Sequence, residues 1–303
     1  MTYTKQDQTE MNLAKHPKAR RVTGDSKVTS KAVTPLNKGK LQVQRFVIPY
    51  RVYGDAEDTL VFINGIQQSM AMWHSFVRRF EQSYRIVLFD FPHQGTSEIV
   101  TGSATVTLDE QVEILDAVVK ATSGAEQPTI CSASWGGVVA LAYAARHPDR
   151  LKSLILASMG MKANQAMIEL ITRGLAMPSK DGSTVAETVI QGVGQKLPDA
   201  MKGRILGQFQ RMSKEAIEAF CQHGLTVISV RDLTEVVDLS KVRCQTMLLH
   251  GENDVIIDAE DVRSLAAQIA HAEMRTIKGV GHFLHLEKEE ILDVYEEVLA
   301  SVR

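Results

Sequence analysis

Apolar and polar positions alternate along most of the chain with two periods, one typical of strands and the other typical of amphipathic helices. The first part contains four short runs rich in β-branched and aromatic residues, and a helical pattern separates the third run from the fourth. The predicted strands are residues 41–46, 48–53, 60–64 and 84–89, and the predicted helix lies around residues 70–80.

A strong helix start follows at Thr107. Glu110 stands three residues later, which is the spacing of a capping box, in which the Thr hydroxyl and the Glu carboxylate satisfy free backbone N–H groups. Leu108, Val112 and Leu115 fall on one helical face, so we expect this helix to pack on a sheet. The alternation then continues with predicted strands at 128–132, 151–158, 246–250 and 273–277 and helices at 136–147, 259–269 and 287–301.

The strand signal disappears between residues 159 and 239. This segment is helical in pattern, rich in Met and Ile, and interrupted by proline and glycine near residues 178, 182 and 198. The strand and helix alternation on both sides of it indicates a mostly parallel sheet with right-handed crossovers. We therefore predict an α/β core formed by residues 41–158 and 240–303, with residues 159–239 inserted as a helical lid.

The first 40 residues differ from the rest of the chain in charge. They hold nine Lys or Arg against three Asp or Glu, whereas the remaining residues hold 25 against 33. A disordered tail is the preferred interpretation, because these basic residues are interspersed with Gly, Pro and Asn and form no apolar stripe. A transit peptide or a nucleic-acid-binding arm is the alternative. We expect no nucleic-acid partner.

Length and composition are those of a globular protein. A chain of 303 residues with 44% apolar and 23% charged residues is neither disordered throughout nor fibrous. No run approaches the roughly 18 apolar residues of a spanning helix, and the N-terminus lacks the apolar region of a secretion signal. Three scattered cysteines argue against a disulfide framework. We therefore expect a cytoplasmic protein without a transmembrane segment.

Candidate chemistry centres on Ser134, in the segment CSASWGG (131–137) between a predicted strand and a predicted helix. A nucleophile elbow needs this context, because its sharp turn exposes the central hydroxyl at the helix N-terminus. Small neighbours let the strand and the helix pass close together, and Gly136 meets that need, while Ser132 replaces the usual Gly. An ordinary strand-to-helix turn is the alternative for this segment taken alone.

Two later residues complete a candidate catalytic triad. Asp254 follows the predicted strand at 246–250, and His282 lies 28 residues further on, in the segment GVGHF (279–283). A carboxylate beside a histidine holds the ring in the required tautomer and stabilises the imidazolium that forms during attack. The order Ser, Asp, His is that of α/β-hydrolases. A helix-capping carboxylate and a surface histidine are the alternatives for each residue alone.

An acyl-transfer serine also needs backbone donors for the oxyanion, each contributing about 3 kcal/mol. The elbow geometry assigns one donor to the N–H of Trp135, and we assign the other to Ile66, in the loop after the strand at 60–64. A plain turn is the alternative for that loop. His282 and His285 form an H-x-x-H pair without a cluster of supporting ligands, so we expect no metal. Phosphate-binding and dinucleotide motifs are absent from the sequence, and we expect no cofactor.

Residues 60–290 resemble the α/β-hydrolase fold family. Within it they resemble the bacterial group that contains the rhamnolipid-pathway 3-(3-hydroxyacyloxy)alkanoate synthase and the 3-hydroxyacyl-ACP:CoA transacylase. Two departures stand out: the segment IQQSMAMW (66–73) has fewer small residues than its counterparts, and His285 replaces the usual acid. The segments that carry the likeness are SASWGG (132–137), FING (62–65), VLFDFP (87–92) with Gly95 and Ser97, NQAM (164–167), VGQKLP (193–198) and GHFLHLE (281–287).

This resemblance implies that Ser134 is the nucleophile, Asp254 the acid and His282 the base of an enzyme that handles 3-hydroxyacyl chains. We therefore expect a serine acyl-transfer enzyme that takes a (3-hydroxy)acyl group from a thioester of coenzyme A or acyl carrier protein and passes it to an alcohol or a thiol. Unbranched thioethers adapt to alkyl chains. The expected substrate contacts are Asn64, Gln67 and Trp73 near the oxyanion loop, and Met161 and Met167 in the lid.

Two alternatives stay open. One is an α/β-hydrolase that cleaves a small ester, thioester or lactone with water. The other is a non-catalytic ligand-binding protein on the same fold, and the apparently complete triad argues against it. Four basic residues of the lid either meet an acidic carrier protein or form a solvated face; they are Lys196, Lys202, Arg204 and Arg211.

Overall fold

The computed structural model describes residues 33–124, 126–177 and 181–302, so most of the expected basic tail lies outside the described residues. The central feature is a sheet with the strand order β1-β2-β4-β3-β6-β7-β8-β9, and β5 pairs with β2. The strands β4, β3, β6, β7, β8 and β9 pair in parallel, in that order. β2 pairs antiparallel with both β1 and β4. The mostly parallel sheet is thereby confirmed. The strands are β1 (Asn37–Val43), β2 (Phe46–Tyr53), β3 (Thr59–Ile63), β4 (Arg85–Phe89), β5 (Glu98–Ile99), β6 (Thr129–Ala133), β7 (Ser153–Ala157), β8 (Gln245–Gly251) and β9 (Ala272–Ile277).

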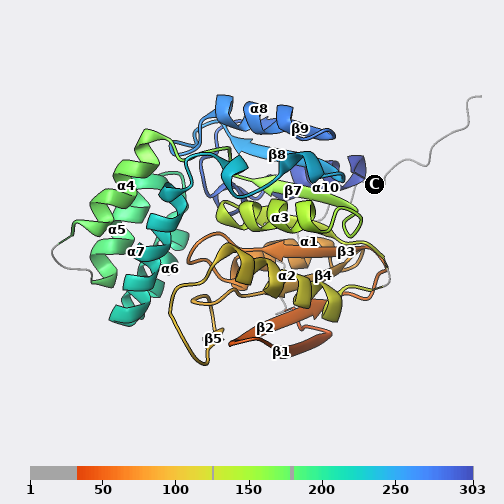
Figure 1. The fold of residues 1–303 in the computed structure, drawn as a ribbon, viewed down its shortest axis with the longest axis horizontal. Helices are drawn as coiled ribbons and strands as arrows, with labels where there is room; N and C mark the ends of the chain where they lie inside the picture. Colours follow the sequence, from red (N-terminus) through yellow and green to blue (C-terminus); the bar gives the residue numbers. More distant parts are fainter. Residues whose placement is uncertain (1–32, 125, 178–180, 303) are drawn as a thin grey trace, which may run out of the picture. The chain divides into compact units, whose positions relative to one another are not determined.

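Helices cover both faces of this sheet (Figure 1). Strand residues alternate between two apolar clusters: Val61 and Ile63 pack with α2, α3 and α8, whereas Leu60 and Phe62 pack with α1 and α10. Burial on both faces explains the almost continuous apolar runs of the parallel strands. The helices are α1 (His74–Phe80), α2 (Leu108–Thr122), α3 (Trp135–Arg146), α4 (Gln165–Leu175), α5 (Gly182–Val193), α6 (Asp199–Gln210), α7 (Lys214–Ser229), α8 (Ala259–Gln268), α9 (Leu284–Glu287) and α10 (Ile291–Ser301), with 3-10 turns η1 (Met70–Trp73), η2 (Leu233–Glu235) and η3 (Leu239–Lys241).

Local rules account for the helix boundaries. The capping box of α2 is present, with Thr107 accepting from the N–H of Glu110 and the Glu110 side chain accepting from the N–H of Thr107. Asn164 and Ser213 cap α4 and α7 with the N-cap side chain alone, each accepting from the N–H three residues later. The capping-box prediction is therefore confirmed.

The first strand begins earlier than the sequence pattern predicts. We expected the tail to extend through residue 40, but β1 starts at Asn37, and Lys40 pairs in register with Pro49 of β2. β1 lies at the edge of the sheet and its residues alternate between exposed and half-buried, so it carries no apolar run that would reveal it. The helix expected at 287–301 starts later than predicted: α10 begins at Ile291, and Glu287 is instead the last residue of the short helix α9.

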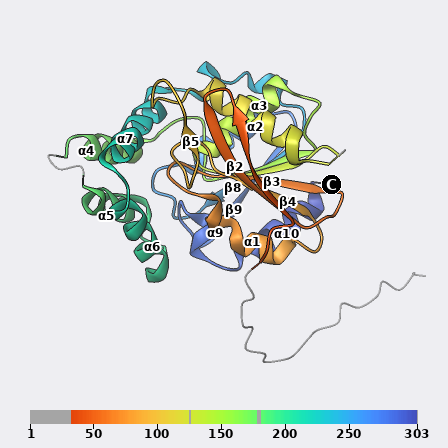
Figure 2. The same cartoon turned by 90° about the horizontal axis from the view of Figure 1, so that it is seen from below.

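Helices α4 to α7 form the segment between β7 and β8 (Figure 1). Figure 2 shows the same four helices grouped beside the sheet in the perpendicular view. They have a small apolar core of their own, which includes Val185, Phe209 and Ile217. A Cβ at Gly182 would lie 2.0 Å from the carbonyl O of Phe209, so the close approach of α5 to the end of α6 requires a glycine. We call this four-helix segment the lid.

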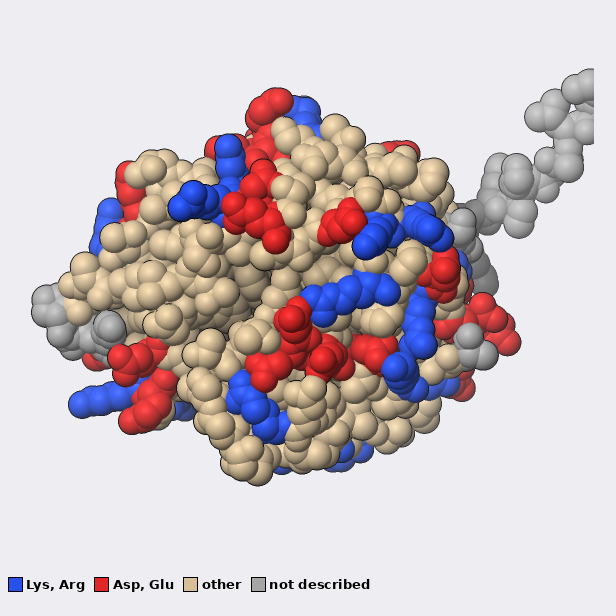
Figure 3. Space-filling view, viewed as in Figure 1, with Lys and Arg blue, Asp and Glu red and all other residues tan. Residues whose placement is uncertain are grey.

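The face shown in Figure 3 is not dominated by one sign of charge. On the face shown in Figure 3, Lys and Arg side chains alternate with Asp and Glu over the core, whereas a broad area over the lid carries neither. Among the residues described, no helix combines the length and the apolar character needed to cross a membrane.

Candidate active site

Ser134 occupies a sharp turn between β6 and α3. Its backbone has φ 50° and ψ −125°, a left-handed region that is unfavourable for a residue with a side chain. The turn is also tight: a Cβ at Gly136 would lie 2.6 Å from the carbonyl O of Asn64 and 2.8 Å from a methyl carbon of Ile63. The strained serine and the required glycine together make the strand–turn–helix geometry of a nucleophile elbow.

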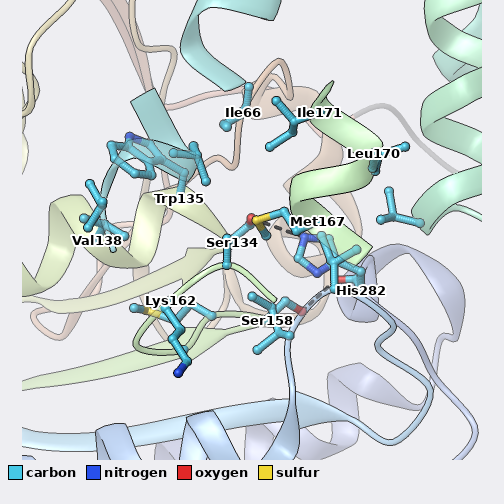
Figure 4. Close-up of a pocket in the computed structure, with 18 of the residues that line it drawn as sticks. Ile66, Ser134, Trp135, Val138, Ser158, Lys162, Met167, Leu170, Ile171 and His282 are labelled. Atoms are coloured by element: carbon cyan, nitrogen blue, oxygen red, sulfur yellow. Dashed lines mark hydrogen bonds between the residues drawn. The ribbon is translucent and has the colours of Figure 1, made fainter. Parts of the chain in front are cut away.

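Ser134, His282 and Asp254 form one line of hydrogen-bonding contacts (Figure 4 shows the serine and the histidine). The Ser134 Oγ lies 3.2 Å from Nε2 of His282, and Nδ1 of His282 lies 2.9 Å from Oδ2 of Asp254. The serine follows β6, the aspartate follows β8 and the histidine follows β9, so the three residues meet because neighbouring parallel strands end at one edge of the sheet. In this arrangement Nε2 is positioned to accept the serine proton.

The carboxylate of Asp254 is held in its charged form. Burial alone would raise the pKa of Asp254, but the adjacent His282 and hydrogen bonds outweigh burial and lower it. Its second oxygen, Oδ1, accepts from the backbone N–H groups of Ile256 at 3.0 Å and Ile257 at 3.2 Å. An ionised carboxylate against Nδ1 keeps the proton on that nitrogen and leaves Nε2 free to act as a base.

Two residues that sequence reasoning missed hold the loop of His282. Glu287 accepts from the N–H of Gly281 at 2.5 Å and from the N–H of Phe283 at 3.1 Å. Ser158 donates from its hydroxyl to the carbonyl O of His282 at 2.6 Å. Ser158 directly follows β7 and has φ 58°, and its place at the end of a parallel strand is the signal that points to it.

His285 does not lie in the site. Its ring is buried and stacks on the indole of Trp73 at 4.6 Å, and burial, with a smaller contribution from the charge of His282, lowers the pKa of His285 to about 3. The ring is therefore neutral at pH 7. Across residues 33–302, with the gaps stated above, no group of three or more His, Cys, Asp or Glu side chains is arranged to hold a metal ion.

The loop expected to supply an oxyanion donor is braced by a buried polar network. Asn64 Nδ2 lies 3.1 Å from Oδ1 of Asp90 and 3.0 Å from Oε1 of Gln94. Gln94 in turn donates to the carbonyl O of Gly65 at 2.7 Å, and Gln68 accepts from the N–H of Gly65 at 2.7 Å. Both sides of Gly65 are thus fixed, one residue before Ile66.

Three of the expected substrate contacts do not lie in the cavity beside Ser134. Asn64 is 2% exposed and Trp73 is fully buried, and the indole N–H of Trp73 donates to Oδ1 of Asn64 at 2.8 Å. Gln67 contacts the lid: its Nε2 lies 3.3 Å from the sulfur of Met212, and its carbonyl accepts from Gln208. The polar atoms of Asn64, Trp73 and Gln67 bond to other protein groups, so these residues hold the oxyanion loop in place.

An apolar pocket opens beside Ser134 and His282 (Figure 4). Met161 and Met167, two of the predicted substrate contacts, line it, and so do Ile66 and Trp135, whose N–H groups are the predicted oxyanion donors. The lid forms one wall and the core loops form the other. The apolar side chains of the lid helices in the pocket are Met167, Leu170, Ile171, Val189, Val193, Phe220 and Val227.

The strained serine, its histidine and carboxylate partners and the adjoining apolar pocket form the arrangement that is typical of enzymes with the α/β-hydrolase fold. The family model described as "alpha/beta hydrolase fold" matches residues 58–289, so the chain belongs to this family. Its resemblance to the 3-hydroxyacyl transacylase group is borne out by a curated relative, the (R)-3-hydroxydecanoyl-ACP:CoA transacylase of Pseudomonas aeruginosa. That protein is 23% identical over 253 residues, which cover 82% of this chain and 83% of the relative.

Other similar proteins are named as esterases or lactonases. The pimeloyl-[acyl-carrier protein] methyl ester esterase of Nitrosospira multiformis is 27% identical over 76% of this chain and 89% of its own length. Among solved structures, a thermophilic esterase from Thermogutta terrifontis has a TM-score of 0.73 at 19% identity, covering 88% of this chain and 99% of that chain. The enol-lactonase from Burkholderia xenovorans has a TM-score of 0.70 at 18% identity, covering 87% and 99%. These likenesses show the α/β-hydrolase fold, and the chain is an enzyme of that family.

Proposed function

We propose that this enzyme transfers an acyl group, of the (3-hydroxy)acyl thioester class, to an alcohol or a thiol through an acyl-serine. The observation that carries the proposal is the line from Asp254 through His282 to Ser134, which ends at an apolar pocket. The names of two relatives, which refer to acyl groups on acyl carrier protein, support the thioester class.

In the proposed first half-reaction, His282 takes the proton of Ser134 as the serine oxygen forms a bond to the thioester carbonyl carbon. The oxyanion lies between the N–H groups of Trp135 and Ile66. The carbon–sulfur bond then breaks, and the thiol leaves with the proton from His282. In the second half-reaction, the acceptor gives its proton to His282 as it bonds to the acyl carbon; the bond between that carbon and Ser134 Oγ then breaks, and His282 returns the proton to the serine oxygen.

The lid favours an alkyl substrate over a polar one. Met167, Leu170 and Ile171 come from successive positions of one face of α4 and point their apolar side chains at the pocket (Figure 4). Burial of a methylene group contributes about 0.8 kcal/mol, so a chain of several carbons is recognised by length rather than by a specific hydrogen bond. The same dry wall keeps water from the acyl-serine while an acceptor enters.

Product analysis tests the proposal. The purified full chain is incubated with 3-hydroxyacyl thioesters of several chain lengths, with and without an added alcohol or thiol, and the products are identified by mass spectrometry. A new ester or thioester that requires the acceptor is expected. Free acid at the same rate with and without acceptor would instead identify a hydrolase.

Hydrolysis of a small ester, thioester or lactone is the second candidate. The esterase and lactonase names among the relatives favour it, and the same triad performs it when water takes the place of the acceptor. The ratio of transfer product to free acid separates the two candidates directly.

A further inference from the structure

A second cavity lies on the other side of the oxyanion loop. Ile66 and Gln68 line the apolar pocket, whereas Gln67 and Ser69 line a groove between this loop, the segment from His93 to Ala104 and the end of α6. Residues of the segment that carries β5 line this groove together with residues of α6 and α7. The two cavities lie against the same loop and share no lining residue.

The groove is basic. Its lining includes Arg204, Arg211 and His93 but neither Asp nor Glu, although acidic residues outnumber basic ones in the chain as a whole. Both guanidinium groups lie on exposed side chains, and no carboxylate of the described residues lies within ion-pairing distance of them. By contrast, Lys202 on the same helix faces Asp199 at 3.6 Å.

The basic side chains share one face of the helix. Arg204, Gln208 and Arg211 follow one another at spacings of four and three residues, which places them along one side of α6 and its end. Gln208 Nε2 also donates to the carbonyl O of Gln67 at 2.8 Å, so this side of α6 is attached to the oxyanion loop. Two cations beside the loop that is expected to bind the substrate carbonyl are well placed for an anionic group of the same substrate.

We infer that the groove binds the phosphate groups of a coenzyme A thioester whose acyl chain lies in the apolar pocket. This inference rests on the proposed thioester substrate. Arg matches phosphate oxygens with paired N–H donors. Coenzyme A carries three phosphate groups, whereas the prosthetic arm of a carrier protein carries one, so two unpaired arginines in one groove favour coenzyme A as the occupant.

Calorimetric binding of coenzyme A to the full chain is the direct test. In the double variant R204Q/R211Q the dissociation constant should rise about tenfold, because each exposed charge pair contributes a factor of roughly two to five. Arg173→Gln removes the same charge from an exposed position of the lid outside the groove and should leave the dissociation constant unchanged. Equal affinity of the wild type and R204Q/R211Q for coenzyme A would overturn the inference.

A kinetic measurement distinguishes this inference from the proposed function. The ratio of kcat/KM for an acyl-coenzyme A to kcat/KM for the same acyl group on N-acetylcysteamine, which has no phosphate, should fall about tenfold in R204Q/R211Q. An unchanged ratio would contradict the phosphate site, and a loss confined to acyl carrier protein would reassign the arginines to protein docking. If the wild type turned over no thioester, the proposed function would fail, and the calorimetric result would still decide the groove.

Discussion

The core and the lid position their side chains by different means. In the core, Ser134, Asp254 and His282 each lie on the turn or loop that follows a parallel strand. Backbone hydrogen bonds to Asp254 and the hydrogen bond from Ser158 fix their geometry further. In the lid, the pocket residues are held by contacts between helices, such as the packing of α4 on α7 and of α5 on α6. A substitution in the core can therefore remove a single hydrogen bond of the site. A substitution in the lid instead changes the packing of the helices that form one wall of the apolar pocket.

Replacing the nucleophile should have the largest effect. Ser134→Ala removes the only oxygen proposed to bond to the substrate carbonyl, and kcat should fall by about 10⁵-fold or more. The lost hydrogen bond to His282 is 3.2 Å long, so the thermal unfolding midpoint should change little. Steady-state kinetics with an acyl thioester, together with a thermal melt, check both parts. Retention of full activity by this variant would remove Ser134 from the mechanism.

The buried carboxyl behind the oxyanion loop should make stability depend on pH. Burial raises the pKa of Asp90 from 3.8 to about 6. The free energy of unfolding is therefore about 3 kcal/mol higher when Asp90 is protonated than when it is ionised in the folded protein. Because the raised value disfavours the charged form in the folded state, this contribution is fully present below about pH 4 and is lost as the pH rises to 6. Urea unfolding of the wild type and Asp90→Asn between pH 4 and pH 7 should show the loss in the wild type alone.

Asparagine keeps an acceptor for the N–H of Met70 and for Asn64, so Asp90→Asn is expected to fold. If both proteins lost stability in parallel across this range of pH, the titration would belong to other groups.

A truncation in the lid should change the preference for chain length. Met167→Ala removes a pocket side chain that is 8% exposed, and kcat/KM for long acyl chains should fall about tenfold, with a smaller fall for acetyl substrates. Ile168→Ala is the matched control, because Ile168 is the next residue of α4 and is 36% exposed outside the pocket. Kinetics over a series of chain lengths compare the two variants. Equal effects on short and long chains would argue against an alkyl site.

The smallest effect is expected from Ser158→Ala. This variant loses the 2.6 Å hydrogen bond to the carbonyl O of His282 while the bonds to Glu287 remain. A net hydrogen bond contributes about 1 kcal/mol, so kcat should fall about fivefold with KM nearly unchanged. Measurement of kcat and KM with one thioester is sufficient, and an effect as large as that of Ser134→Ala would show that Ser158 does more than position the histidine.

The candidate catalytic residues can be predicted from the sequence more reliably than the residues that contact the substrate. Ser134 and Gly136 are recognisable because the elbow needs a fixed order of residue types, and Asp254 and His282 because each follows a predicted strand. The roles of Asn64 and Trp73 were not predictable in the same way, because Asn64 finds its partners Asp90 and Gln94 on another loop, 26 and 30 residues away. Burial and the choice of partner arise only when the chain folds.

Detection of the acyl-serine tests the central claim most directly. The wild-type enzyme is mixed with a 3-hydroxyacyl thioester without acceptor, quenched in acid within seconds and examined by intact and peptide mass spectrometry. We expect a mass increase equal to the acyl group, located on the peptide that contains Ser134. Product formation without any acylated Ser134, or acylation at another residue, would contradict the account.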